Sequence, residues 1–330
     1  MRTDGPEFRK LLQLIETQYG LHVTDEPALQ LGGVESAVWL AETNQGRFYL
    51  KLYGCHQGPP ERILDEVHLY EYLRQHNINA PEVVPSLHNS KVVTLHHARI
   101  AFNVIVMKHE ELRRVRPSTS TEYDITLLGV TISRLHKAMK SYPDKGYLTI
   151  GTGLLTPLCD SYQILLSSYN GQAFAETEKR WIAEVDRRVM EYIKKNSVEE
   201  DQLSSSIIHN DLALEHAQLL KTGEFYLIDF ADRCIGPVSW DLAMMAGSFY
   251  WSDELSFAKW ESLTDLFVEG YSSETCLTSE ELAAIKPMMV RQLIGAARYL
   301  NLVSNKEQRE VDAEGIKRRY KLAHYLTGDI

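Results

Sequence analysis

The sequence predicts an α+β fold in which a small β-rich N-terminal lobe precedes a larger, mainly helical C-terminal lobe. Residues 28–53 contain three short strand-like runs, separated by turns that contain glycine. Further along the chain, most apolar residues recur with helical spacing. One β-like block, residues 207–230, interrupts this helical region. No long linker separates the β-rich part of the sequence from the helical part, so we divide the chain near Met107. The predicted domains are residues 1–107 and 108–330.

The N-terminal lobe is expected to alternate helices and strands. Two turn sequences, Gly32-Gly33 and Asn44-Gln45-Gly46, separate its first three strands. Apolar periodicity predicts helices over residues 8–19 and 61–78, and β-rich runs over 91–95 and 100–107.

The C-terminal lobe is expected to be built from helices around one short β block. Helical spacing is found in residues 125–139, 161–169, 180–193 and most of 255–330. The β block consists of short apolar runs, two of which are joined by a Thr222-Gly223 turn.

Composition narrows the class of protein. The 330 residues are 44% hydrophobic and 24% charged, which is typical of a soluble globular chain. No apolar run approaches the roughly 18 residues of a membrane span, and no leader is evident, so a cytoplasmic location is expected. The net charge of −10 disfavours nucleic acid and favours a cationic partner. The four cysteines lack paired spacing, which argues against a zinc cluster or a disulfide framework.

Four polar side chains follow the short strands of the β block. These residues are His209, Asp211, His216 and Asp229. Because side chains at strand ends emerge at one edge of a sheet, we expect the four to converge. Phosphoryl transfer needs a group that orients the attacking hydroxyl and a metal held by hard oxygen ligands. Asp211 and Asp229 are suited to these two tasks.

The ordered motifs of this region resemble those of the aminoglycoside phosphotransferase and choline kinase family. That family carries His-Gly-Asp-x-x-x-x-Asn, then Ile-Asp-Phe or Ile-Asp-Trp, and then Asp-Leu-Ala. The corresponding residues here are His209-Asn210-Asp211 with His216, Ile228-Asp229-Phe230, and Asp241-Leu242-Ala243. The resemblance covers roughly residues 28–250 and implies a protein-kinase-like bilobal fold and an ATP- or GTP-dependent kinase.

The resemblance also implies a role for each motif residue. Asp211 would be the catalytic residue, Asp229 and His216 would bind Mg²⁺, and His209 and Asp241 would support the loop. His216 departs from the family pattern, which usually has asparagine there, and Mg²⁺ prefers oxygen ligands to imidazole nitrogen. A purely structural role for His216, or a weakened enzyme, therefore stays open.

The N-terminal lobe provides candidates for nucleotide binding. The Gly32-Gly33 turn and Ser36 would bring backbone amides close to phosphate oxygens. Lys51 lies inside an apolar run and therefore needs an anionic partner. On the following helix, Glu66 falls within the apolar stripe, whereas Asp65 is expected to point away, so we select Glu66 as the partner of Lys51.

The strand that ends at Met107 resembles the interlobe hinge of the family. The resemblance implies that Met107 flanks the nucleotide base and that backbone groups up to His109 bind its edge. His136 is expected to pack against the Asp211 loop, and Asp232 to serve the turn before Gly236-Pro237 in preference to a metal.

Three hypotheses about function follow. The first is a kinase that phosphorylates a hydroxyl of a small molecule such as an aminoglycoside or other antibiotic, an amino alcohol or a sugar, with acidic and aromatic residues 249–254 favouring a cationic acceptor. The second is a nucleotide-binding pseudokinase that acts through interactions. The third, a metal hydrolase, leaves Lys51 and Glu66 without a role. None of the three involves nucleic acid or a membrane.

Overall fold

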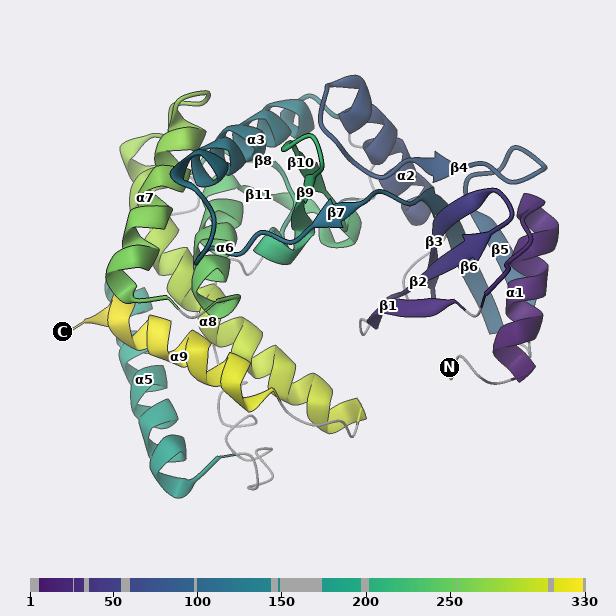
Figure 1. Cartoon of the computed structure of the whole chain (residues 1–330). Coiled ribbons are helices and arrows are strands. Elements are labelled where there is room, and N and C mark those ends of the chain that lie inside the picture. Colours follow the sequence, from purple (N-terminus) through teal and green to yellow (C-terminus); the bar gives the residue numbers. More distant parts are fainter. Residues whose placement is uncertain are drawn as a thin grey trace. The chain divides into compact units, whose positions relative to one another are not determined.

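The computed structural model divides into two compact units. The first comprises residues 1–113, 143–147 and 219–231, and the second comprises residues 114–142, 148–218 and 232–330. The described residues are 6–25, 27–32, 36–54, 60–97, 100–143, 148, 174–196, 202–253, 255–307 and 312–328. Figure 1 shows the elements along the chain, coloured from the N-terminus to the C-terminus.

The first unit is built on an antiparallel six-stranded sheet. Its strand order is β1-β2-β3-β6-β4, and β5 also pairs with β6. The strands are β1 (Ala28–Gly32), β2 (Ser36–Thr43), β3 (Gly46–Tyr53), β4 (Val83–Val84), β5 (Val93–His97) and β6 (Ile100–Lys108). In this register Lys51 lies opposite Ile105 on β6 and Val38 on β2. The strand that carries Lys51 is thus in the interior of the sheet.

Alternation along β3 gives its side chains two different environments. Phe48, Leu50 and Leu52 belong to the apolar core that the sheet forms with α1 (Pro6–Tyr19). Because successive side chains of a strand point to opposite faces, Lys51 and Tyr53 point to the other face. There they meet α2 (Pro60–Gln75).

The chain also forms a second sheet, of three strands. It contains β7 (Leu112–Arg113), β9 (Ala217–Leu220) and β10 (Phe225–Leu227), in the order β10-β9-β7. Asn79 accepts a hydrogen bond from the Leu227 N–H at 2.9 Å and donates one from its side chain to the Phe225 carbonyl at 3.2 Å. These bonds fix the chain directly before Asp229.

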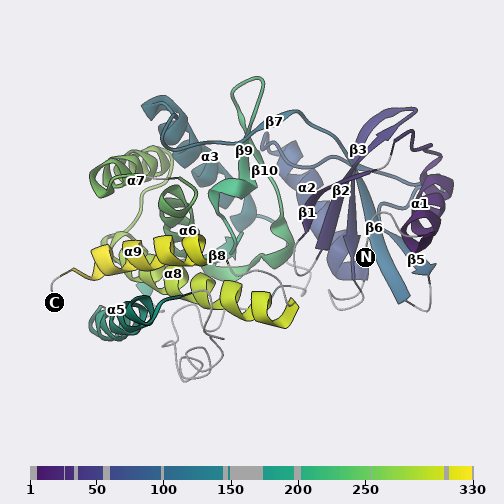
Figure 2. The ribbon, with the colours of Figure 1, turned by 60° about the horizontal axis from the view of Figure 1, so that its bottom comes forward.

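The second unit is mainly helical, with one two-stranded sheet of β8 (Ser205–Ile208) and β11 (Cys234–Pro237). Figure 2 shows its helices from a second direction. They are α3 (Glu122–Lys140), α5 (Glu176–Lys195), α6 (Val238–Trp251), α7 (Phe257–Ser272), α8 (Ser279–Glu307) and α9 (Ala313–Thr327). Short 3₁₀ turns cover Leu214–His216 and Phe230–Asp232. No helix in the described part of the chain is both long and apolar enough to cross a bilayer.

Most of the predicted elements that fall within the described residues are present. The predicted helix over residues 161–169 lies outside the described residues. Asp65, expected to point away from the core, is only 2% exposed, because α2 is buried over more than one face. Helix α6 was not predicted, because nearly all its side chains are buried and an apolar helix shows no amphipathic period. Cys234 and Cys276 are unpaired thiols.

Close packing of α3 against α7 yields a prediction about stability. A Cβ on Gly129 would lie 2.1 Å from the Phe267 carbonyl oxygen. Gly129→Ala should therefore push the two helices apart and lower the free energy of unfolding by about 2–3 kcal/mol. Gly295→Ala on α8 is the matched control, since nothing lies within 4 Å of its Cβ position. The control should gain about 0.5–1 kcal/mol from helix propensity. Thermal denaturation followed by circular dichroism measures both, and equal melting temperatures for Gly129→Ala and wild type would refute the close contact.

Candidate functional site

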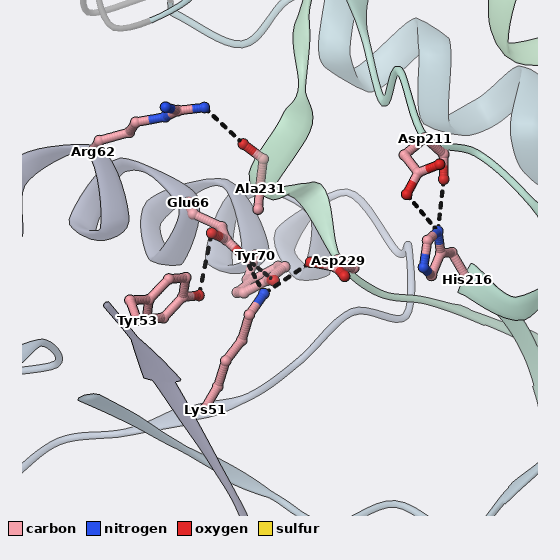
Figure 3. Close-up of polar contacts among 9 residues, drawn as sticks. All are labelled: Lys51, Tyr53, Arg62, Glu66, Tyr70, Asp211, His216, Asp229 and Ala231. Carbon is pink, nitrogen blue, oxygen red and sulfur yellow. Dashed lines mark hydrogen bonds and ion pairs between the residues drawn. The ribbon is translucent and has the colours of Figure 1, made fainter. Parts of the chain in front are cut away.

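A buried lysine in the first unit holds two carboxylates. Lys51 Nζ lies 3.2 Å from Glu66 Oε1 and 2.9 Å from Asp229 Oδ1 (Figure 3). The lysine and Glu66 side chains are almost inaccessible, whereas the Asp229 side chain is 39% exposed. The helical periodicity of residues 61–78 predicted Glu66 as the partner of Lys51, and the structure shows this contact. Asp229, which lies 178 residues from Lys51 in the sequence, comes to the same ammonium group.

The electrostatic environment keeps this lysine charged. Burial alone would lower the pKa of Lys51, but Glu66, Tyr70 and Asp229 outweigh it, so the pKa is raised well above its ordinary value. A buried ammonium group with two carboxylate partners remains protonated at neutral pH. The exposed side of the Asp229 carboxylate stays open to solvent.

Two tyrosines that the sequence reasoning overlooked complete the cluster. The Tyr53 hydroxyl donates to Glu66 Oε2 at 3.2 Å, and the Tyr70 hydroxyl donates to Glu66 Oε1. Both could have been found from spacing. Tyr53 lies two residues after Lys51, on the same face of β3, and Tyr70 lies one helical turn after Glu66. The two hydroxyls hold the glutamate in the orientation that meets the lysine.

The segment after β10 has a backbone that few residues adopt. Asp229 has a φ of 65°, in the left-handed region, where residues other than glycine are uncommon. Phe230 is fully buried, with its ring edge-on to Tyr70 at 5.9 Å. The Ala231 carbonyl accepts a hydrogen bond from Arg62 on α2 at 3.2 Å. Helix α2 therefore contacts both residues that follow Asp229.

The other predicted nucleotide-binding residues are placed as follows. Gly32 ends β1 and Ser36 begins β2, while Gly33 lies outside the described residues. Met107 is buried in β6, opposite both Tyr49 and Val83.

His109 follows β6 and lines a hollow of the first unit. Its N–H donates to the Arg47 carbonyl at 3.3 Å, and its ring lies 5.1 Å from that of Tyr49. Burial, and then the charge of Arg47, lower its pKa. The hollow has a volume of about 560 Å³ and is lined by Arg47, His109, Glu110, Glu111, Leu220, Lys221 and Thr222.

In the second unit, a fully buried carboxylate braces the Asp211 loop, which we define as residues 209–216. Asp241 accepts hydrogen bonds from the backbone N–H of His209 at 2.7 Å and of Asn210 at 2.8 Å. It also lies 3.1 Å from His136 Nε2, and His136 Nδ1 lies 3.0 Å from the Tyr271 hydroxyl. Because a carboxylate only accepts, His136 donates from Nε2. These contacts connect the backbone of the loop to Asp241, and Asp241 in turn to His136.

Asn210 occupies the position where the family motif has glycine. Its φ is 71°, a left-handed conformation that glycine adopts freely and asparagine tolerates. Its side-chain amide donates to the Asp232 carbonyl at 3.0 Å, and its carbonyl accepts from Trp240 Nε1 at 3.2 Å. Asn210 thus retains the backbone geometry and adds a bond that glycine cannot make.

The loop presents Asp211 to solvent and fixes His216 beside it. The Asp211 side chain is 48% exposed and that of His216 is 14% exposed. His216 Nδ1 lies 2.6 Å from the Asp211 carbonyl oxygen and 3.7 Å from Oδ2 (Figure 3). Since a carbonyl oxygen only accepts, Nδ1 carries a proton, and in the neutral ring Nε2 is the nitrogen with the lone pair. The ring also stacks on buried His209 at 5.8 Å.

The donor set bears on metal binding. Within the described residues, no group of three or more His, Cys, Asp or Glu side chains is arranged to hold a metal ion. Mg²⁺ commonly binds through one or two protein carboxylates and completes its coordination with phosphate oxygens and water. The partly exposed carboxylate of Asp229 is suited to that kind of site. A metal-binding histidine usually donates its other ring N–H to an oxygen, as His216 does.

The left-handed backbone of Asn210 and its side-chain hydrogen bond lead to a stability prediction that compares two variants. Asn210→Gly should lose only the side-chain hydrogen bond, about 1 kcal/mol. Asn210→Ala should lose about 1 kcal/mol more, because alanine is strained at a φ of 71°. Urea denaturation of both variants measures the difference. An alanine variant as stable as the glycine variant would argue against backbone strain at this position.

The chain is similar in sequence to known phosphotransferases. The model of the APH phosphotransferase enzyme family matches residues 29–285. A homoserine kinase from Beijerinckia indica subsp. indica is 25% identical over 275 residues, which cover 81% of this chain and 76% of the relative.

Two solved structures show the same fold. An amicoumacin kinase in complex with AMP-PNP, Ca²⁺ and Ami aligns with a TM-score of 0.72 and 18% identity, over 96% of this chain and 92% of that one. A microcompartment-associated aminopropanol kinase aligns with a TM-score of 0.68 and 18% identity, over 96% and 94% of the two chains. The predicted protein-kinase-like α+β fold is confirmed.

Proposed function

Because this chain belongs to the phosphotransferase enzyme family, we propose that it transfers the γ-phosphate of ATP or GTP to a hydroxyl of a small molecule. The chain is a kinase with a hydroxyl acceptor. The observation that carries the proposal is the contact of buried Lys51 with both Glu66 and Asp229. A metal hydrolase would have no use for this cluster, whereas a kinase uses it to hold nucleotide phosphates.

Each residue has a proposed task. Lys51, oriented by Glu66, binds phosphate oxygens of the nucleotide, and Gly32, Gly33 and Ser36 are our candidates for backbone contact with the phosphates. Met107 flanks the base, backbone groups up to His109 bind its edge, and the first unit is the nucleotide-binding part of the chain. Exposed Asp211 accepts the proton of the acceptor hydroxyl and orients its oxygen. Asp241 and His209 support this loop and take no part in the chemistry.

We propose that Asp229 binds a divalent cation, Mg²⁺, and that His216 is a candidate metal ligand through Nε2. The cation would neutralise charge on the transferring phosphoryl group. Support comes from the partly exposed carboxylate of Asp229 and from the proton on His216 Nδ1, since a metal-binding histidine usually donates its other ring N–H to an oxygen.

The acceptor we propose is a small hydroxylated amine. Among the relatives, one is a homoserine kinase and another an aminopropanol kinase, and both of these named compounds carry an amino group and a hydroxyl. The net charge of −10 is compatible with attraction of such an amine.

The proposed chemistry is tested at Asp211. Asp211→Asn keeps the size of the side chain but cannot accept the hydroxyl proton, so kcat should fall by about 10²–10⁴-fold. Nucleotide affinity should be unchanged, because the substitution does not alter the Lys51 cluster. Coupled nucleotide-consumption assays with a panel of amino alcohols, hydroxy amino acids and amino sugars measure kcat, and fluorescence titration measures nucleotide binding.

The same assay separates a kinase from a pseudokinase. If wild-type protein binds nucleotide but, with every acceptor, consumes it no faster than the Asp211→Asn variant, the kinase proposal fails. Binding without turnover would then favour a protein that acts through interactions.

The metal role of His216 is tested by ion preference. Imidazole nitrogen suits Mn²⁺ better than Mg²⁺, and an amide oxygen is a harder ligand. In His216→Asn, the Mg²⁺ concentration that displaces half of the bound Mn²⁺ should therefore fall by about tenfold. Electron paramagnetic resonance of Mn²⁺ with AMP-PNP measures this without turnover. His88→Asn, an exposed imidazole of the first unit, is the control. Unchanged ion preference in His216→Asn would show that the histidine is structural.

A further inference from the structure

A cavity of about 750 Å³ lies among α7, α8 and α9 of the second unit, and we call it the α7–α9 cavity. Small-molecule sites commonly have volumes of about 300–1,000 Å³. None of the lining residues belongs to the Asp211 loop or to the Lys51 cluster. Figures 1 and 2 both place the C-terminal end of α9, which borders the cavity, at the other end of the second unit from β8, the strand that leads into the loop. The proposed chemistry therefore leaves this cavity without a role.

One side of the cavity is apolar and aromatic. Ile285 and Met289 contribute from α8 and Leu326 from α9, and all three side chains are buried. Trp260 of α7 is 4% exposed, and Tyr325 of α9 is 37% exposed. Their rings meet edge-on, with the centroids 6.4 Å apart. Such a surface favours a ligand with an apolar body.

Both aromatic side chains are held in place within the folded chain. Trp260 Nε1 donates to the Ala246 carbonyl of α6 at 2.8 Å. The Tyr325 ring lies nearly parallel to that of Phe257, with the centroids 3.9 Å apart. Its hydroxyl donates to Glu261 Oε1 at 2.8 Å. A site whose side chains are already fixed loses little conformational entropy when a ligand binds.

The polar side of the cavity carries two carboxylates. Glu261 and Asp265 lie one helical turn apart on α7, and both are exposed to solvent. Like charges at this spacing repel each other. Neither carboxylate forms an ion pair within the described part of the chain. The ammonium group of Lys286, which also lines the cavity, instead lies over the ring of Tyr192 on α5, 5.8 Å from the centroid. The accessible carboxylate oxygens therefore lack a cation.

We propose that the α7–α9 cavity binds a small organic cation with an apolar body, such as an arylalkylammonium ion. The ammonium group lies beside Glu261 and Asp265, and the apolar body lies against Trp260, Tyr325 and Met289. Charge complementarity selects a cation, because an anion would be repelled and a neutral ligand would leave the two carboxylates uncompensated. Aromatic rings also attract cations. The inference does not rest on the proposed function, since no residue assigned to that function lines the cavity.

Three probes separate the charge of the ligand from its apolar body. 3-Phenylpropylamine has both, 3-phenylpropan-1-ol lacks the charge, and propylamine lacks the ring. Isothermal titration calorimetry of the full chain without nucleotide should give the first probe an affinity at least about tenfold higher than that of either analogue. Added salt should weaken the binding of 3-phenylpropylamine and leave that of the alcohol unchanged, because salt screens only the charged ligand.

Matched variants locate the site. The double variant Glu261→Gln, Asp265→Asn keeps the shapes of both side chains and removes their charges. It should bind 3-phenylpropylamine about 5–30-fold more weakly and the alcohol within about twofold of wild type. Glu269→Gln is the control, because it removes an exposed carboxylate of the same helix that does not line the cavity. The control should bind 3-phenylpropylamine within about twofold of wild type. Equal affinity of the wild type for the amine and the alcohol, or unchanged amine affinity in the double variant, would overturn the proposal.

Phosphorylation assays show whether this cavity is separate from the acceptor site. With the panel of acceptors described above, the double variant should keep the kcat/KM of the wild type within about twofold. A parallel loss of amine binding and of kcat/KM would identify the cavity as the acceptor site and contradict a separate one. If the amine binds as expected while the wild type phosphorylates no acceptor, the cation site stands and the kinase proposal alone fails.

Discussion

The buried ammonium group of Lys51 is the constraint on which the first unit depends. A lysine in an interior strand of a sheet is unfavourable unless anions surround it, and Glu66 and Asp229 are those anions. Their recruitment fixes the face of α2 that meets the sheet and the position of the segment after β10. The hydroxyls of Tyr53 and Tyr70 donate further hydrogen bonds to the Glu66 carboxylate. Removal of Lys51 would leave Glu66 as a buried carboxylate without a cation beside it.

The second unit also contains a buried charge that needs partners, in this case a single carboxylate. Asp241 is fully buried and is compensated by two backbone N–H groups and His136. Because the donors at positions 209 and 210 are backbone atoms, the carboxylate holds the path of the loop without using the side chains of Asp211 and His216. This leaves Asp211 and His216 free to carry functional groups. The left-handed backbone at Asn210 belongs to the same arrangement.

The sequence predicted well those features that depend on local pattern. Strand alternation and helical phase identified Lys51 and Glu66 as partners, because each pattern states which side chain faces inward. Helix α6 was missed because an all-apolar helix shows no period, and buried Asp65 was misplaced because α2 packs on more than one side. The contact of Asp229 with Lys51 spans 178 residues, and no local pattern encodes such a distance.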